Sequence, residues 1–438
     1  MKRRQAAVLK SLADVRNPEN NFPLLILPFY LVMLTCLELR WLKAARFVGN
    51  ILEKCLGINC LVELARATIY SQLRDHALEC KTLMRLLVDN PHDFEMITRA
   101  GLSAAYAGQV ESLISIRDVA AQQNLSVQCY LDGLLAFLNK EPKYYVFFQK
   151  SVEYFQGLIN RDLKGELPEY IKLAHNVGKW RVNDDLASEV GLAPKIYREL
   201  EFEITQSFRL ENRGPVVLIS CDECYLVTFA DFFIKSFRLM NQDIIHFHVV
   251  TDDIDFARKY LHDLRNKYSN VYFSVELLNG RSKTYITIVR YLICRDVMNF
   301  YARDVLISDI DMCLKFNTEV ISQEITFKNY DFGLCDEGFS VPWAKFAAGL
   351  SYFRVDNVAS NDLLEFLNAY LVKMYSDVGF WTMDQMGILV AFENLQLSNP
   401  KFLMLNLNEL VDFNSLISVP RRLQRQKIVC KFQNGAPK

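Results

Sequence analysis

The sequence predicts a protein of two domains: an all-α half followed by an α/β half with a mostly parallel sheet. Three observations lead to this prediction. At 438 residues the chain is longer than one hydrophobic core usually supports. From about residue 20 to 200, apolar residues recur at three- and four-residue spacings, which is typical of helices. After residue 213, strand-like apolar runs alternate with helical ones.

The composition is that of a folded protein with balanced charge. Hydrophobic residues make up 51% of the chain, and the formal net charge is −1. Because proteins that bind phosphate backbones normally carry a basic excess or a concentrated basic face, we expect no nucleic-acid partner. The 11 cysteines form no regular framework, which favours a reducing, cytoplasmic location. We interpret Cys221 and Cys224 as two loop thiols; a redox pair or half of a zinc site is the alternative.

The N-terminus lacks the apolar core and cleavage site of a signal peptide. The segment Phe22–Leu37 is uncharged, but it is shorter than a usual membrane span and contains Pro23 and Pro28. We interpret it as a buried helix, with membrane association as the less favoured alternative.

Residues 1–200 are predicted to form a helical domain with an internal repeat. Breaks at Asp89–His92 and Lys140–Pro142 separate the helical patterns, and small residues recur 34 positions apart at Ala67 and Gly101. The pattern resembles tetratricopeptide repeats. The matching positions are Ile97, Gly101, Gly108 and Ala120. The resemblance implies a stacked surface for a protein partner or for self-association, and a plain helical array is the alternative.

Residues 201–213 are predicted to be a linker, and residues 214–438 the α/β domain. The expected strands are Val216–Ser220, Ile244–Val250, Val271–Leu277 and Val305–Ile307, and the expected helices are Tyr225–Met240, Ile254–Tyr268 and Thr284–Phe300. Such alternation produces right-handed crossovers and a mostly parallel sheet covered on both faces. Ligands of such sheets bind at the carboxyl ends of the strands.

Two acids follow the fourth of these strands. Asp309 and Asp311 are two residues apart, so at a strand's end they point to one face while Ile310 points into the core. Two convergent carboxylates suit Mg²⁺ or Mn²⁺ carried with a diphosphate. The sequence therefore predicts a divalent-cation site here, and the alternative is a pair of acids that cap a turn.

Other polar groups fall where the same geometry would bring them together. Asp222 follows the first strand and Thr251–Asp253 the second. Ala347–Gly349 precedes the strand-like run Leu350–Val355, and small residues there let a ligand approach the backbone. Trp381–Gln385 opens an amphipathic helix. We expect these groups to share the carboxyl edge of the sheet.

At this point the α/β half resembles GT-A nucleotide-sugar glycosyltransferases, in particular the retaining enzymes of the family 8 type. The segment ISDIDM matches the family's D-x-D element, AAGLSYFRV resembles its N-A-G strand entry, and DQMGIL resembles its D-Q-D-x-L-N segment. The helix carrying Arg290 resembles the Arg-bearing helix before the D-x-D strand. The four elements keep the family's order across about half of the chain.

The resemblance implies a role for each element. Mn²⁺ or Mg²⁺ held by Asp309 and Asp311 would bind the donor's diphosphate and stabilise the leaving group. Asp311 is implied as the more direct ligand, and Asp309 also reaches the donor. Arg290 would offer a fixed positive fork to donor oxygens.

The remaining implied positions surround the nucleotide and the sugar. Asp222 would accept hydrogen bonds from the nucleobase or ribose, with Tyr225 near enough to stack. Gly349 would let the donor approach the backbone. Asp384 and Gln385 would face the sugar hydroxyls and the reacting carbon, which makes them the expected catalytic residues.

Each position also has a purely structural alternative. Asp222 is alternatively an ordinary turn residue, and Asp384 a first-turn acid that favours the helix dipole. Arg290 is alternatively a solvated helix side chain, and Gly349 a packing glycine.

The chain departs from the family pattern at the third metal ligand. The family commonly supplies a late histidine, whereas all six histidines here lie at or before His262. The oxygen donors available instead are Asn406, Asn408, Asp412 and Asn414. We expect Asp412 or Asn414, with Asp412 as the named candidate. The family's C-terminal lysine also lacks a clear counterpart. The residues available to replace it are Arg421, Arg422, Arg425 and Lys427, and a solvated basic tail is the alternative interpretation.

The implied reaction is transfer of a sugar from a nucleoside diphosphate, preferably UDP, to a protein or glycan acceptor with retention of configuration. The alternative is an inactive helical scaffold whose degenerate transferase domain binds protein partners. A nucleotidyltransferase would need a glycine-rich basic loop after the first strand, where Ser220–Cys224 is acidic instead.

Overall fold

The structure is a computed structural model of the 438-residue chain. It describes residues 27–38, 41–56, 60–159, 168–178, 201–202, 214–278, 283–314, 316–338, 341–378 and 382–411. The chain divides into two compact units, residues 1–178 and 179–438.

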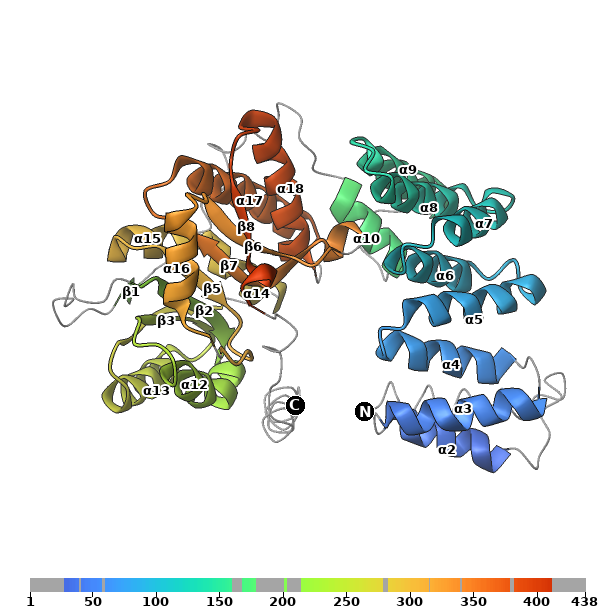
Figure 1. The fold of residues 1–438 in the computed structure, drawn as a ribbon, viewed down its shortest axis with the longest axis horizontal. Helices are drawn as coiled ribbons and strands as arrows, with labels where there is room; N and C mark the ends of the chain where they lie inside the picture. The colour runs from blue at the N-terminus through green and yellow to red at the C-terminus, as the bar shows by residue number, and fades with distance from the viewer. Residues whose placement is uncertain are drawn as a thin grey trace. The chain divides into compact units, whose positions relative to one another are not determined.

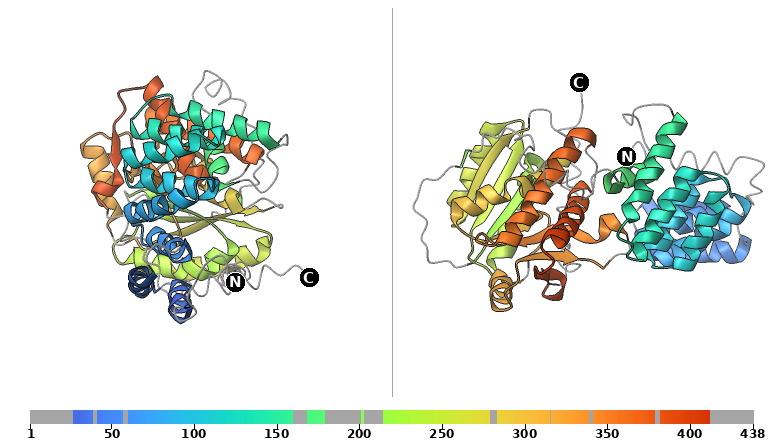
Figure 2. Two further views of the ribbon diagram at one scale, coloured as in Figure 1. Left: turned by 90° about the vertical axis from the view of Figure 1, so that its right-hand side faces the viewer. Right: turned by 90° about the horizontal axis from the view of Figure 1, so that it is seen from above.

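The first unit is all-α in its described residues, as predicted. Its helices are α2 (Leu27–Glu38), α3 (Leu42–Leu56), α4 (Cys60–Gln72), α5 (His76–Asp89), α6 (Phe94–Tyr106), α7 (Val110–Ala121), α8 (Leu125–Leu138), α9 (Tyr144–Ile159) and α10 (Glu169–Gly178). Each helix packs against the next, and α4 to α9 lie side by side (Figures 1 and 2). Asp75, Asp93 and Asn124 start three of these helices, because each side chain accepts a hydrogen bond from a first-turn backbone N–H.

The starts of the helices repeat at the predicted spacing. Helices α5, α7 and α9 begin at His76, Val110 and Tyr144, 34 residues apart each time. A small residue permits one of the helix contacts, because a Cβ added to Gly101 of α6 would lie 2.2 Å from Cδ2 of Leu131 in α8. The assignment to the tetratricopeptide family stays a prediction.

The second unit contains one sheet, which is mostly parallel as predicted. Its strands in the described residues are β1 (Glu201–Phe202), β2 (Val216–Asp222), β3 (Ile245–Thr251), β4 (Val271–Leu277), β5 (Val305–Ser308), β6 (Phe332–Asp336), β7 (Phe346–Phe353) and β8 (Met404–Asn406). The spatial order is β1-β4-β3-β2-β5-β7-β6-β8. Strands β1 and β7 run antiparallel to their neighbours, and the other pairs are parallel. Strand β1 lies within the segment 201–213 that was expected to link the two halves.

Helices cover both faces of this sheet (Figures 1 and 2). They are α12 (Glu223–Arg238), α13 (Ile254–Lys267), α14 (Lys283–Leu292), α15 (Cys294–Tyr301), α16 (Thr318–Phe327), α17 (Val358–Val378) and α18 (Met383–Ser398), with short 3₁₀ turns η2 (Pro342–Ala344) and η3 (Leu407–Glu409). The expected helix 284–300 is two helices, separated at Ile293, whose φ is −97° and ψ is −7°.

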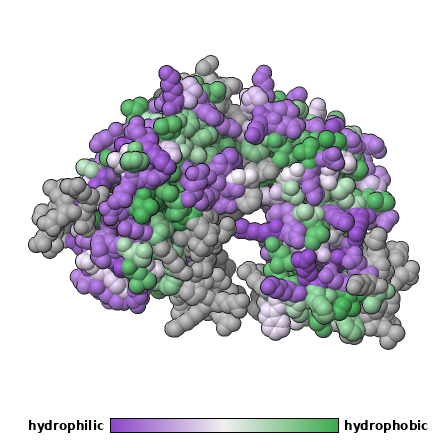
Figure 3. Space-filling model, in the orientation of Figure 1, coloured by the Kyte–Doolittle hydropathy of each residue, from purple (hydrophilic) through white to green (hydrophobic). Residues whose placement is uncertain are grey.

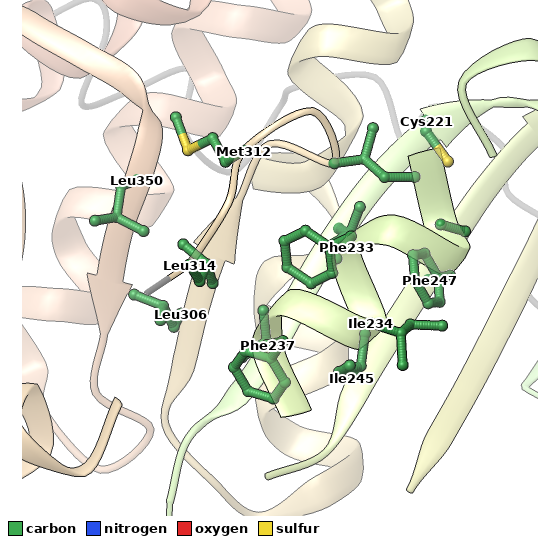
Figure 4. Packing of buried hydrophobic residues seen from close by; sticks show 14 of the residues in the cluster. Cys221, Phe233, Ile234, Phe237, Ile245, Phe247, Leu306, Met312, Leu314 and Leu350 are labelled. Carbon is green, nitrogen blue, oxygen red and sulfur yellow. The ribbon is translucent and has the colours of Figure 1, made fainter. Parts of the chain in front are cut away.

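The two faces of the sheet differ in chemistry. On one face, Ile245 and Phe247 of β3 pack against Phe233 and Phe237 of α12 in a continuous apolar core (Figure 4). Since side chains alternate along a strand, the next residues of β3 point to the other face. These include His248, which is buried and polar. The second face is therefore a buried polar surface over β3 and β4.

Two predicted features need correction. Cys221 and Cys224 were expected in a loop, but Cys221 is buried in β2 and Cys224 lies in the first turn of α12. No loop separates the two elements, because Asp222 ends β2 and at the same time caps α12. The segment Phe22–Leu37 was expected to be a buried helix, but its described residues form most of the 12-residue helix α2, in which Phe29 and Val32 are exposed. Its first five residues, 22–26, lie outside the described residues. None of the helices described is both long enough and apolar enough to cross a membrane.

Candidate functional site

A buried arginine joins two of the predicted motifs. Arg290 in α14 donates one hydrogen bond from Nη1 to Asp309 and another from Nη2 to Oδ2 of Asp384 at 2.9 Å. Its partners come from the end of β5 and the start of α18, so the fold brings together residues 19 and 94 positions away in the sequence. The expectation that the Arg290, D-x-D and D-Q elements share one site is therefore met by direct contacts.

The burial of this group is uneven. The side chains of Arg290 and Asp384 are 6% and 11% exposed, whereas that of Asp309 is 38% exposed. The alternative that Arg290 is a solvated helix residue is therefore wrong. Asp309 lies at the open side of the cluster, where a ligand from solvent can reach it.

Burial and the neighbouring charges shift the pKa values of two members of the cluster. Burial raises the pKa of Asp384 above its ordinary value, and the nearby Asp309 charge adds to the shift, while Arg290 opposes it. Burial would lower the pKa of Arg290, but Asp309 and Asp384 hold it above its ordinary value. The guanidinium is thus always charged, and burial favours the neutral form of Asp384.

Asp309 and Asp311 lie in a turn, not in the strand. Strand β5 ends at Ser308, and the N–H of Met312 donates to the carbonyl of Asp309 at 3.3 Å. Ile310 is buried and the two acids are partly exposed, as expected. The turn therefore produces the predicted in-and-out pattern by a different backbone path. Whether the two carboxylates share a cation stays a prediction.

Gly349 holds the backbone at this turn. Because β7 runs antiparallel to β5, its first half lies at the carboxyl edge, and Leu350 pairs with Ser308. The carbonyl of Gly349 accepts a hydrogen bond from the N–H of Asp309 at 3.1 Å. The small-residue passage thus positions Asp309 through its main chain.

Asp384 and Gln385 begin α18. Thr382 precedes the helix in the left-handed region with a φ of 76°, which is rare for a β-branched residue. Oδ1 of Asp384 accepts a hydrogen bond from the N–H of Gln385 at 2.9 Å, and Gln385 is partly exposed. Asp384 therefore lies in the first turn of the helix, as its structural alternative states, and also contacts Arg290.

Asp222 and Tyr225 lie at the carboxyl end of β2, the strand beside β5. Oδ1 of Asp222 accepts a hydrogen bond from the N–H of Tyr225 at 2.7 Å and so caps α12. The ring of Tyr225 packs 5.4 Å from that of Phe229. These contacts give both residues a structural role, and their contact with a nucleotide stays a prediction.

The candidates for the third metal ligand have different outcomes. Oδ1 of Asn406 accepts hydrogen bonds from the N–H groups of Asp336 and Asn408, so that oxygen is used in a turn. Asp412 lies outside the described residues, as do Asn414, Arg421, Arg422, Arg425 and Lys427. The described ranges contain no group of three or more His, Cys, Asp or Glu side chains that could hold a metal. The pair Asp309 and Asp311 still supplies the hard oxygen chemistry that Mg²⁺ and Mn²⁺ prefer.

The sequence alone did not indicate two further polar contacts at this edge. Nζ of Lys345 donates to Oδ2 of Asp336, the last residue of β6, at 2.5 Å. The hydroxyl of Tyr291, next to Arg290, donates to the carbonyl of Ala348 at 2.7 Å and so ties α14 to β7. The rule that acids follow the strands of such a sheet could have identified Asp336, whereas nothing local marks Tyr291.

Comparisons with known proteins give the following. No protein-family model and no curated protein matches the chain. Among solved structures, the glycosyltransferase GlyE of Streptococcus pneumoniae TIGR4 is 18% identical, with a TM-score of 0.31 over 44% of this chain and 45% of its own. Mouse xyloside xylosyltransferase 1 is 12% identical, with a TM-score of 0.29 over 44% and 84% of the two chains. The galactosyltransferase LgtC is 16% identical, with a TM-score of 0.28 over 40% and 70%. The match spans less than half of the GlyE chain, so the assignment of a function rests on the side chains of the site.

Proposed function

We propose that the α/β unit is a metal-dependent glycosyltransferase that moves a sugar from a nucleoside diphosphate, preferably UDP, to a protein or glycan acceptor. One observation carries the proposal. The buried guanidinium of Arg290 contacts Asp309 of the D-x-D element and Asp384 of the D-Q element at the carboxyl edge of the sheet. Three of the motifs that suggested the family resemblance are thus in direct contact.

The charges of the cluster support binding of a diphosphate together with a cation. Asp309 and Asp384 carry two formal negative charges against one positive charge on Arg290, and Asp311 follows Asp309 by two residues. An excess of negative charge attracts a divalent cation. Asp309 and Asp311 would hold Mn²⁺ or Mg²⁺, with Asp412 as the candidate third ligand. The ion would neutralise the charge that develops on the departing diphosphate.

The chain's own residues would orient the donor. Arg290 would donate to donor oxygens on the open side of the cluster, where Asp309 is exposed. Asp222 and Tyr225 would contact the nucleoside, and Gly349 would border the donor at the backbone. Asp384 and Gln385 would face the sugar, and the proposed transfer retains its configuration.

The helical unit would bind a protein partner, contribute to acceptor recognition or mediate self-association. Its helix pair α2–α3 exposes large apolar side chains, and Figure 3 shows hydrophobic residues on this surface. They are Phe29, Val32, Phe47 and Ile51, together with Trp41, which directly precedes α3. The ten cysteines among the described residues are free thiols, which fits the proposed cytoplasmic location.

The test compares the wild type with Asp311→Ala. Hydrolysis of a panel of nucleotide-sugars is measured with Mn²⁺, with Mg²⁺ and with a chelator. We expect metal-dependent hydrolysis by the wild type and a loss of roughly 100-fold or more in the variant. Asp263→Ala serves as the matched control, because Asp263 is an exposed acid on α13. Turnover that is independent of metal, or unaffected in Asp311→Ala, would rule out the metal role.

A binding measurement separates the enzyme from the scaffold alternative. Calorimetric titration of UDP-sugars into the full chain, with and without Mn²⁺, should show heat that depends on the metal. A protein that only serves as a helical scaffold would show no such heat.

A further inference from the structure

A continuous chain of buried polar side chains crosses β3 and β4. His246 bonds through Nδ1 to the hydroxyl of Tyr301 at 2.8 Å and through Nε2 to Oγ of Ser274 at 2.9 Å. Ser274 is also 2.8 Å from Nδ1 of His248, whose Nε2 lies 3.2 Å from Oε2 of Glu276. The two histidines, Ser274 and Glu276 are all at most 3% exposed.

The chain ends on the helix that carries Arg290. The hydroxyl of Tyr285 in α14 donates to Oε1 of Glu276 at 2.7 Å. Tyr285 is fully buried, and Arg290 follows five residues later on the same ten-residue helix. A second bond supports the same helix, because Oγ of Ser220 in β2 donates to the carbonyl of Ile286 at 3.3 Å.

One direction of hydrogen bonding satisfies the whole chain. Tyr301 donates to His246, and His246 donates from Nε2 to Ser274. The hydroxyl of Ser274 then donates to His248, which donates from Nε2 to Glu276. In this arrangement the imidazole of His246 is neutral, with one donor and one acceptor nitrogen. Burial, together with the neighbouring His248, lowers the pKa of His246 to about 3, in agreement with the neutral form.

Apolar side chains could fill the same interface in place of this polar chain. Buried polar groups stabilise less than well-packed apolar ones unless they fix a unique geometry. The opposite face of the same strands is apolar and packs against α12. The polar groups therefore lie on the face of β3 and β4 that Tyr285 of α14 contacts through Glu276.

We propose that the Tyr301–His246–Ser274–His248–Glu276–Tyr285 chain positions α14 and thereby aims the guanidinium of Arg290 at Asp309 and Asp384. In the transferase proposed above, on which this role rests, these six are positioning residues and do not touch the donor. Removing the Tyr285 hydroxyl would leave an oxygen of Glu276 without this donor and let α14 rotate.

The first test measures the helix itself and does not depend on catalysis. In Tyr285→Phe the ring keeps its packing, including its contact with Tyr375 at 5.6 Å. Amide hydrogen exchange in peptides covering residues 283–292 should be about fivefold to tenfold faster. Tyr352→Phe is the matched control, because Tyr352 is also buried and donates to a carboxylate, Asp304, at 2.8 Å. Equal exchange of 283–292 in the wild type and Tyr285→Phe, or equal acceleration in both variants, overturns the proposal.

The second test asks whether Tyr285 acts through Arg290. With UDP-glucose and UDP-galactose plus Mn²⁺, Tyr285→Phe should lower kcat about tenfold and leave KM within about twofold. The reason is that the guanidinium of Arg290 stays charged and only its orientation changes. In the Arg290→Lys background, Tyr285→Phe should cause no further loss. Additive losses would overturn the positioning role. If the wild type hydrolyses no nucleotide-sugar, the transferase proposal fails, and the exchange measurement still decides the question of α14.

Discussion

Arg66 of the helical unit and Arg290 of the α/β unit are both buried arginines that pair with two carboxylates. Arg66 contacts Glu63 at 2.5 Å and Glu53 at 2.8 Å, and also donates to the hydroxyl of Tyr70. Two of these partners lie three residues before it and four after it on α4. Arg290, in contrast, contacts Asp309 and Asp384 on separate elements.

The difference separates a structural ion pair from a candidate site. Glu63 is fully buried, so the Arg66 group is closed on the side of its nearest partner. The Arg290 group is open at Asp309 and lies where ligands of such sheets bind. A buried arginine alone therefore says little about function, and the informative features are the exposure of its partners and their place at the sheet edge.

The largest expected effect tests the open cluster. Arg290→Ala should lower turnover of the donor by about 1000-fold, because it removes a fixed positive group from the proposed diphosphate site. Steady-state hydrolysis of UDP-sugars measures the loss. Arg295→Ala is the control, because Arg295 is more exposed and pairs with Glu365; it should stay within about twofold. Equal losses in the two variants would contradict a special role for Arg290.

The next effect tests the closed cluster. Arg66→Met should destabilise the helical unit by about 3 kcal/mol, because it leaves Glu63 buried without its counter-charge. Urea denaturation followed by circular dichroism measures this loss, and donor turnover should not change. Arg85→Met is the matched control: Arg85 pairs with the same Glu53 but is more exposed, and its removal should change stability by about 1 kcal/mol or less. A folded Arg66→Met protein without activity would contradict the distinction between a structural Arg66 and a functional Arg290.

The smallest effect concerns pH, because the pKa shifts of one carboxylate in each cluster have opposite directions. Although burial opposes it, Arg66 and Arg85 lower the pKa of Glu53 below 4.5, so its stabilising contribution is present above pH 4.5 and is lost as the pH falls through its folded value. The pKa of Asp384 is raised above 3.8, so acidification neutralises Asp384 at a higher pH than an ordinary aspartate and weakens its pairing with Arg290.

The loss of turnover on the acid side should therefore be centred above pH 3.8, and the loss of stability of the helical unit below pH 4.5. The pH profile of kcat/KM and urea denaturation of the helical unit at several pH values measure the two. A loss of turnover centred at or below pH 3.8 would show that burial does not raise the pKa of Asp384.

Patterns of a few residues predicted the helices and strands, but the turn at Asp309 and the contact between Arg290 and Asp384 depend on tertiary structure. Alternating runs predicted β2 to β5 to within about two residues, because the sheet is buried on both faces. They did not predict the turn at Asp309, since the strand ends where its pairing with β7 ends at Leu350. The link from Arg290 to Asp384 spans 94 residues, and no local rule contains such a distance.

Because local patterns do not predict tertiary contacts, the sequence also did not predict the polar face of β3 and β4. His246 and His248 occupy alternate positions in a run that is otherwise apolar, and the sequence alone does not distinguish a histidine that binds a ligand from one that is satisfied inside the core. Only the contacts with Ser274 and Glu276 on the neighbouring strand show that both are satisfied.

The reversed direction of β7 makes the site unequally tolerant to changes in chain length. The carbonyl of Gly349 reaches the N–H of Asp309 one residue beyond the β5–β7 ladder, and a residue inserted between Gly349 and Phe353 would shift that register and turn the carbonyl to the other side. A residue inserted before Phe346, near η2, would leave the pairing of β5 and β7 intact. Natural variation in length among related chains, and engineered loops, should therefore be found before Phe346 and be absent between Gly349 and Phe353.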